Sequence, residues 1–255
     1  MDAFLDFLQN GALNGLAPGA AALLLAMSLL GSFITASLGL GGGILLLAVM
    51  ASFMPAAALI PVHGVIQLGS NFFRAVVLLG RVHWKPVGAF LLGSIAGVAI
   101  GGSVAIQLPP AVVRIAVGAF VLWSVFRKPP AWLSRAALPT GLISSILTMF
   151  FGATGPFVAA YTKSLTLPRQ EHVATNAVLM TVQHLLKTAT FAVLGFAFGP
   201  WALFIAAMIA MGFIGTLLGK QVLMRFSDRG FKRALDILLV LIALRLVVTG
   251  VLALI

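Results

Sequence analysis

Two cations lie inside long apolar segments of this chain, and each follows a glycine cluster at the same spacing. Arg74 and Lys187 are 113 positions apart, and so are the clusters that precede them, which begin at Gly39 and Gly152. In a bilayer, a charged side chain and a broken helix are both costly, and both usually mark a functional site. The repetition of this pair therefore predicts a duplicated unit that serves one function.

The two cations suit the binding of an oxyanion. An Arg guanidinium can grip an oxyanion with two hydrogen bonds, and a Lys ammonium offers a point charge. Only five Asp and Glu residues occur in the whole chain, so carboxylate partners are scarce and a substrate is expected to supply the negative charge. The alternative is that the cations only reach out to the membrane interface, which is more plausible for Lys187 than for Arg74.

Polar residues share the helix face of each cation. Spacings of three and four place side chains on one stripe of a helix. A lone polar residue in a span often serves only to bind helices together, but two matching stripes indicate a binding surface. The first stripe holds His63, Gln67, Ser70, Asn71 and Arg74, and the second holds Asn176, Gln183, His184 and Lys187, with Thr175 and Met180 nearby.

His184 is the candidate for proton coupling in this set. Histidine is the side chain whose ordinary pKa lies nearest to physiological pH, so it can carry a proton through a transport cycle. His184 could equally serve only as a hydrogen-bond donor to the substrate.

The glycine clusters Gly41–Gly43 and Thr154–Pro156 predict helix breaks within the membrane. A helix that starts at Ile44 or Phe157 would point free N–H groups and its positive end at the break, which favours anions, and the hydroxyl of Thr154 adds a donor. Close helix packing is the alternative, and it better explains the evenly spaced Gly93, Gly97 and Gly101. The predicted substrate-binding residues are Gly41, Gly42, Gly43, Gln67, Asn71, Arg74, Thr154, Gly155, Thr175, Asn176, His184 and Lys187.

Composition places these residues in a membrane protein. The chain is 61% hydrophobic and only 8% charged, with a mean hydropathy of +1.15, whereas a soluble domain has about a quarter charged residues. The net charge of +11 comes from basic residues in short loops, so nucleic-acid binding is not expected. The acidic start, Met1 to Asp6, is unlike a cleaved signal peptide. We expect an all-α integral membrane protein.

The order of apolar segments predicts two inverted-topology repeats, at residues 1–128 and 129–255. Each repeat comprises a broken or re-entrant helix hairpin followed by three transmembrane helices. Arms of about 15 and 12 residues around the second break are too short to cross a bilayer, which needs about 20 residues. The predicted segments are 17–38, 43–54, 57–80, 85–107 and 110–126 in the first repeat, and 137–151, 156–167, 172–195, 200–223 and 231–254 in the second.

Loop charges predict the orientation. Lys and Arg are enriched in cytoplasmic loops of membrane proteins, and this topology gathers the basic loops on one side. The turns near Pro55, Pro109 and Gly199 and both termini lack Lys and Arg, so both termini are expected outside. The basic loops hold Arg81 and Lys85; Arg127, Lys128 and Arg135; Lys163 and Arg169; and Arg225, Arg229, Lys232 and Arg233.

Enzyme chemistry has no recognisable residue set in the sequence. No Ser/His/Asp set, paired carboxylates, metal-ligand cluster or phosphate loop is present, and the chain has no cysteine. The glycines at 39 and 41 lack the strand and acidic residue of a dinucleotide site. We therefore expect no catalytic residue, no metal and no cofactor.

These segments together resemble the TauE/SafE family of sulfite and organosulfonate exporters over nearly the whole chain. The resemblance rests on Gly39–Gly43, Gln67–Arg74 with His83-Trp84, Gly152–Phe157, Thr175–Ala177 and His184–Lys187. It implies a permease of the bacterial inner membrane, with two repeated halves, that moves small sulfur oxyanions or sulfonates mostly outward.

The leading hypothesis is a secondary transporter that works by alternating access around a central cationic site. Its partners would be a small anion such as sulfite or sulfoacetate, the lipid bilayer and a coupling proton; a homodimer is left open. An uncoupled anion channel or uniporter with the same site is the first alternative. The second is a membrane assembly protein that transports nothing. An intramembrane enzyme is not expected, because the sequence has no nucleophile–base pair.

Overall fold

The computed structural model describes residues 15–39, 41–105, 109–132, 135–222 and 229–254. Within these ranges the chain is helical, with two short 3-10 turns and no strand, which confirms the all-α prediction. The first half contains α2 (Pro18–Leu38), α3 (Gly42–Phe53), α4 (Ala56–Val77), α5 (Val87–Ala105) and α6 (Pro110–Phe126). The second contains α7 (Ala137–Phe151), α8 (Gly155–Ser164), α9 (Arg169–Val193), α10 (Ala202–Val222) and α11 (Arg229–Leu252).

Both predicted breaks occur where the glycine clusters lie. Gly39, Gly41 and Gly152 have φ angles of 89°, 106° and 81°, a region that residues with a Cβ rarely adopt. Helices α3 and α8 begin at Gly42 and Gly155, two residues before the expected Ile44 and Phe157. Glycine needs no side-chain space at these positions, so the helical turn can start within the cluster.

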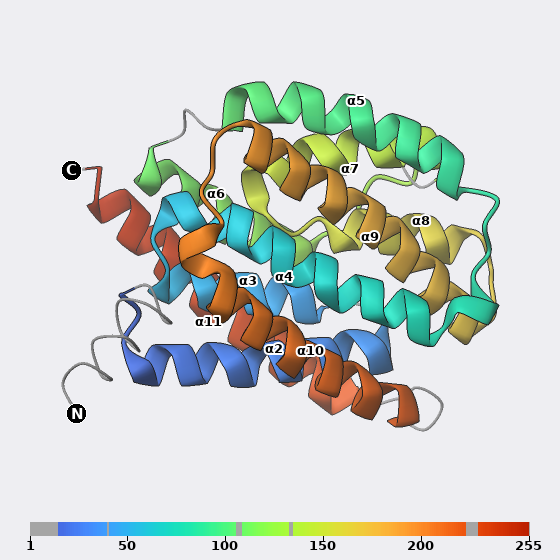
Figure 1. Ribbon diagram of the computed structural model, residues 1–255, viewed down its shortest axis with the longest axis horizontal. Coiled ribbons are helices and arrows are strands. Elements are labelled where there is room, and N and C mark those ends of the chain that lie inside the picture. Colours follow the sequence, from blue (N-terminus) through green and yellow to red (C-terminus); the bar gives the residue numbers. More distant parts are fainter. Residues whose placement is uncertain (1–14, 40, 106–108, 133–134, 223–228, 255) are drawn as a thin grey trace.

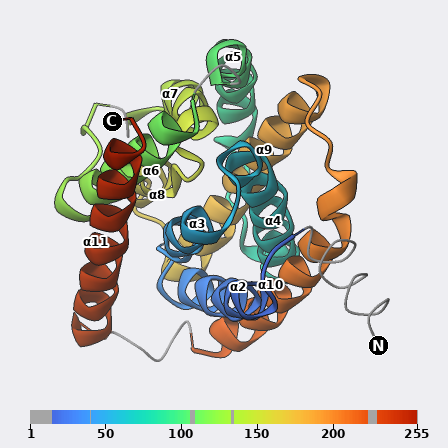
Figure 2. The same cartoon turned by 90° about the vertical axis from the view of Figure 1, so that its left-hand side faces the viewer.

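The two short helices after the breaks lie inside the bundle. Every residue of α3 from Ile44 to Ala51 is buried, and Figure 2 shows α3 near the centre, with α2, α4 and α11 around it. Most of α8 from Phe157 to Thr162 is buried as well. A short helix that is apolar on all sides needs such enclosure, because most of its stability comes from packing.

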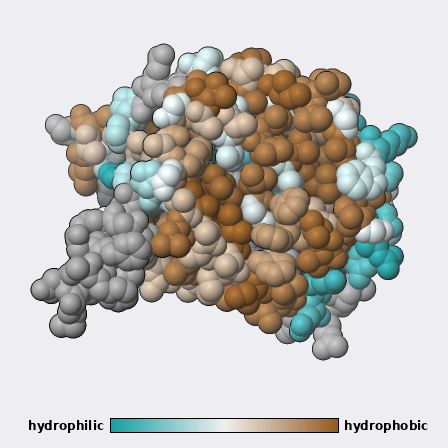
Figure 3. Space-filling view, viewed as in Figure 1, coloured by the Kyte–Doolittle hydropathy of each residue, from teal (hydrophilic) through white to brown (hydrophobic). Residues whose placement is uncertain are grey.

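The outer surface is suited to lipid. Within the described residues, three helical segments are long and apolar enough to cross a membrane: Pro18–Leu38, Ala56–Val77 and Gly199–Gln221. The face in Figure 3 is mostly apolar, and hydrophilic side chains gather at its right-hand edge, where Figure 1 places the α4–α5 and α8–α9 connections. Arg81 and Lys85 in the α4–α5 connection and Lys163 in the last turn of α8 are exposed.

The principal helix pairs join the two halves of the chain. Helix α5 packs on α7, α10 on α2, α11 on α6 and α4 on α9. Close approach is possible because glycines face neighbouring backbone carbonyls. Gly97 faces Leu142 and Gly101 faces Ile146, while Gly215 faces Leu29 and Gly219 faces Phe33. The packing role expected for Gly93, Gly97 and Gly101 is thus confirmed, since Gly93 faces the carbonyl of Leu138 in the same way.

Candidate functional site

Helices α4 and α9 cross at the centre of the molecule with their polar stripes facing each other. The rings of His63 on α4 and His184 on α9 are 6.2 Å apart, edge to face. Both side chains are fully buried, and the Nδ1 atom of each has no hydrogen-bond partner. Two unpaired imidazole nitrogens at one place are unusual, because buried polar atoms are normally paired.

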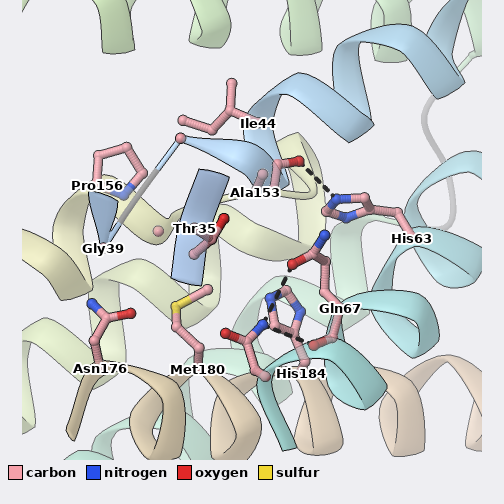
Figure 4. Close-up of a pocket in the computed structure, with 14 residues that line it drawn as sticks. Thr35, Gly39, Ile44, His63, Gln67, Ala153, Pro156, Asn176, Met180 and His184 are labelled. Carbon is pink, nitrogen blue, oxygen red and sulfur yellow. Dashed lines mark hydrogen bonds between the residues drawn. The ribbon is translucent and has the colours of Figure 1, made fainter. Parts of the chain in front are cut away.

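A pocket lies between these stripes, and each helix contributes three side chains to it (Figure 4). The three side chains of α4 pair with the three of α9 at a spacing of 113 positions, the same spacing as the duplicated segments: His63 with Asn176, Gln67 with Met180, and Asn71 with His184. The two repeats therefore contribute equivalent positions to a single pocket.

The two helix breaks form the remaining walls. The cavity of this pocket has a volume of about 40 Å³, which is room for a few water-sized groups. Neither α3 nor α8 has a side-chain cap at its N-terminus, and Gly43 and Gly155 in their first turns line the pocket. The remaining lining residues are Thr35, Gly39, Gly41, Gly43 and Ile44 on one side and Ala153, Gly155 and Pro156 on the other.

Seven of the twelve predicted binding residues line this pocket. They are Gly41, Gly43, Gln67, Asn71, Gly155, Asn176 and His184. The other five lie outside its lining: Gly42, Arg74, Thr154, Thr175 and Lys187.

Arg74 lies directly behind the pocket wall. Its guanidinium is buried and donates from NH1 to Asn71 Oδ1 at 2.9 Å and from NH2 to Ser70 Oγ at 3.1 Å. Ser70 in turn hydrogen-bonds Ser32 Oγ of α2 at 2.8 Å. The Nε atom of Arg74 has no partner. Arg74 thus contacts a residue of the pocket and not the pocket itself.

Lys187 is held at the second helix break. Its Nζ donates to the carbonyl oxygen of Gly152 at 2.9 Å, and Thr148 Oγ1 donates to the same oxygen at 3.2 Å. The side chain passes over Gly64 of α4, where an added Cβ would lie 2.7 Å from Lys187 Cε. Lysine is fully buried here only because α4 has a glycine at the crossing.

Neither buried cation has a carboxylate partner within the described part of the chain. Arg74 and Lys187 donate only to neutral oxygens. Uncompensated buried charge is costly, and a mobile anion nearby would offset part of that cost. The space beside the cations therefore favours a negatively charged occupant.

Three predicted residues are engaged in packing or in hydrogen bonds away from the pocket. Thr154 Oγ1 lies 3.0 Å from the Ser144 carbonyl oxygen and 3.1 Å from Gln183 Oε1, and can donate to either. Thr175 Oγ1 accepts from the backbone N–H of His83 at 2.9 Å. At Gly42 a side chain would collide with the backbone of Gly31, so glycine is needed there for the α2–α3 contact.

Several lining residues were absent from the predicted set. His63 and Met180 belong to the stripes, and the 113-residue pairing with Asn176 and Gln67 would have identified them. His63 Nε2 lies 3.0 Å from the carbonyl oxygen of Gly43, which ties α4 to the first break. Thr35 has a counterpart 113 positions on, Thr148, but Thr148 does not line the pocket, and the packing of α2 and α3 brings Thr35 and Ile44 there.

A metal centre has no support in the described residues. No group of three or more His, Cys, Asp or Glu side chains comes together among them. The chemistry of the pocket is that of hydrogen-bond donors, two imidazoles and a positive field, with apolar contacts from Ile44, Met180 and Pro156.

Comparison with known proteins gives one match. The family model described as "Sulfite exporter TauE/SafE" matches residues 23–246, nearly the whole chain. No curated protein and no solved structure matches.

Proposed function

Because the chain belongs to the TauE/SafE family of sulfite exporters, we propose that it carries small sulfur-containing anions, such as sulfite or sulfoacetate, across the bacterial inner membrane, mainly outward. The observation that carries this proposal is the central pocket between α4 and α9, with two uncompensated cations beside it. A transporter needs a site that prefers its substrate yet releases it, and a site made of neutral donors in a positive field meets both needs.

The substrate-binding groups in this proposal are those that line the pocket. Gln67, Asn176 and His184 offer side-chain hydrogen bonds, and Gly43 and Gly155 would offer backbone N–H groups. Asn71 lines the pocket as well, but its amide is bonded to Arg74 and Gln67. Arg74 and Lys187 supply positive charge from behind the wall. The earlier assignment of Arg74, Lys187, Thr154, Thr175 and Gly42 as direct contacts stays a prediction.

Alternating access between two inverted repeats, residues 1–128 and 129–255, is part of the proposal. Helix pairing supports it, because α5 on α7 and α10 on α2 are equivalent pairs under the repeat. The glycine contacts agree residue by residue: Gly97 with Leu142 corresponds to Gly215 with Leu29. Transporters built in this way move one half against the other around a site at the repeat interface.

Proton coupling through His184 is a further part of the proposal. His184 lines the pocket next to His63, and its unpartnered Nδ1 can accept a proton. A proton taken up there would add a positive charge beside the anion.

The orientation with both termini outside follows from the loop charges.

The decisive experiment is efflux from liposomes that contain the purified protein. Sulfite, sulfoacetate, thiosulfate and sulfate are loaded in turn, and release is followed with and without a pH gradient. We expect sulfite or sulfoacetate to leave faster than sulfate, and the His184→Gln variant to lose the effect of the gradient. Empty liposomes and the exposed-loop variant Arg81→Gln serve as controls.

Two results would contradict the proposal. If no sulfur anion moves although the protein is folded, the transport function is wrong and a membrane assembly role gains support. If transport occurs but ignores the pH gradient in the wild type, coupling through His184 is wrong and the protein is a uniporter.

A further inference from the structure

The pocket wall on α4 has a fixed hydrogen-bond polarity that begins at Arg74. We propose that Arg74 is a positioning residue: through Asn71 it holds the Gln67 amide with its NH2 group toward the pocket, so that Gln67 donates there and does not accept. This inference rests on the proposed function of the pocket as an anion site.

The first step is the contact between Arg74 and Asn71. Arg74 NH1 lies 2.9 Å from Asn71 Oδ1. A guanidinium has donors only, so Asn71 must present its oxygen to it. The NH2 group of Asn71 must then point the other way along the helix.

The second step carries the orientation to Gln67. Asn71 Nδ2 donates to the Gln67 backbone oxygen at 2.8 Å and approaches Gln67 Oε1 at 3.4 Å. Gln67 Oε1 is therefore held as an acceptor, and its Nε2 is on the other side of the amide. Figure 4 shows that nitrogen turned toward His63. Among the described residues nothing accepts from Gln67 Nε2, so its protons are free for a ligand.

Neighbouring groups keep the relay in place. Arg74 is anchored by Ser70, which bonds Ser32 on α2, so the guanidinium is tied to a second helix. Gly43 lies against the Gln67 amide, and a Cβ there would be 3.1 Å from Gln67 Oε1. The amide is thus confined between the start of α3 and Asn71.

The second half of the chain has no such relay. The positions equivalent to Arg74, Asn71 and Gln67 hold Lys187, His184 and Met180. Methionine has no donor, and Lys187 is committed to the Gly152 carbonyl. The two walls of the pocket therefore differ, and the oxyanion end of a ligand is expected on the α4 side. A reversed Gln67 amide would present lone pairs to that end and repel it.

A double-mutant cycle on sulfite efflux from liposomes tests this inference. Arg74→Met removes the donors, and we expect it to raise the KM about tenfold, the scale of one hydrogen bond to a charged group. In a Gln67→Met background the same substitution should change the KM less than twofold, because there is no Gln67 amide left for Arg74 and Asn71 to orient. Arg74→Lys, which still only donates, should lie between wild type and Arg74→Met, and the exposed-loop variant Arg81→Met should match wild type.

A second cycle covers the case in which Arg74→Met does not fold. Asn71→Leu is uncharged and of similar size, and it removes both the acceptor for Arg74 and the donor to Gln67 Oε1. With Gln67 present we expect the KM to rise, and in a Gln67→Met background the same substitution should change the KM less than twofold. A rise that persists in Gln67→Met would mean that Asn71 acts on the anion directly, and it would overturn the inference.

Additive effects of Arg74→Met and Gln67→Met would also overturn it, since they would mean that Arg74 contacts the anion or acts by its field alone. This result differs from a failure of the proposed function. In that case the wild-type protein itself would move no sulfur anion, whereas here transport persists and only the coupling between residues is absent.

Discussion

Lys187 and Gly152 are joined by a hydrogen bond of 2.9 Å that fixes helix α9 to the break between α7 and α8. The carbonyl at a broken helix has lost its helical partner, and a buried ammonium replaces it. One lysine thus places a charge beside the pocket and holds the second break in shape.

Removal of this lysine is expected to impair transport more than folding. Lys187→Met leaves the Gly152 carbonyl with Thr148 as its remaining donor, and it removes the cost of burying a charge. We expect at least a tenfold drop in efflux rate, because the positive charge beside the anion is lost. The melting temperature in detergent should stay within a few degrees of wild type, because the lost hydrogen bond and the removed cost of charge burial oppose each other. Collapse of the melting temperature would instead show a structural role.

A related prediction concerns Gly64, where α4 crosses the Lys187 side chain of α9. A methyl group in Gly64→Ala would meet Lys187 Cε at 2.7 Å and displace the ammonium from Gly152. Efflux should fall in the same direction as in Lys187→Met, although Lys187 itself is intact. Gly88→Ala is the matched control, because a Cβ at Gly88 meets nothing within 4 Å. Equal efflux from both glycine variants would contradict the crossing geometry.

The hydroxyl of Thr154 separates a structural role from a binding role. Thr154→Val keeps the shape but loses the hydroxyl that lies 3.0 Å from the Ser144 carbonyl oxygen and 3.1 Å from Gln183 Oε1. Buried groups left without a partner cost about 1–3 kcal/mol, so thermal unfolding in detergent should shift downward while the KM for sulfite stays within twofold. A raised KM with an unchanged melting temperature would mean that Thr154 binds the substrate.

Equivalent glycines in the two halves should have equivalent effects. A Cβ at Gly101 would lie 2.9 Å from the Ile146 carbonyl oxygen, and one at Gly219 would lie 2.6 Å from that of Phe33. Backbone cannot easily move aside, so Gly101→Ala and Gly219→Ala should each destabilise the protein by about 1–3 kcal/mol. Melting temperatures of the two variants, again with Gly88→Ala as control, check the prediction, and a large effect in one half only would weaken the repeat relation.

The proposed orientation can be tested directly because the chain has no native cysteine. Exposed positions on the two sides are Lys85 and Gly199. With an impermeant maleimide on intact cells, Gly199→Cys should react at once and Lys85→Cys only after the membrane is opened. The opposite pattern would invert the topology inferred from the loop charges.

Helix order and the two breaks were predictable from the sequence, because apolar length and glycine clusters act locally. The repeat spacing also predicted which stripes would meet: Asn71 and His184 do lie in one pocket. Whether a polar side chain reaches the pocket or turns to a neighbour depends on the rotation of its helix and on partners from elsewhere in the chain. Arg74 shares its face with Asn71, yet its head group is satisfied beside the pocket by Asn71 and Ser70.

Thr35 shows the limit of pattern reasoning most clearly. Its hydroxyl donates to the Gly31 carbonyl at 2.9 Å, an ordinary contact within α2. It reaches the pocket because α2 bends away at Gly39 and α3 returns beside it. Its counterpart at the 113-residue spacing, Thr148, does not line the pocket, so the spacing alone could not place Thr35 there, and the angle between two helices decides its position.

The pairing of α2 with α10 and of α5 with α7 has a consequence for biogenesis. Helix α2 is made near the start of synthesis, but the glycine face that receives it, around Gly215 and Gly219, is made near the end. Until α10 is made, lipid is expected to contact the face of α2 that α10 later covers. The contact surface of α2 is thus covered only when α10 has been synthesised. In a chain truncated before α10 we expect this surface to stay uncovered, which would favour misassembly and proteolysis.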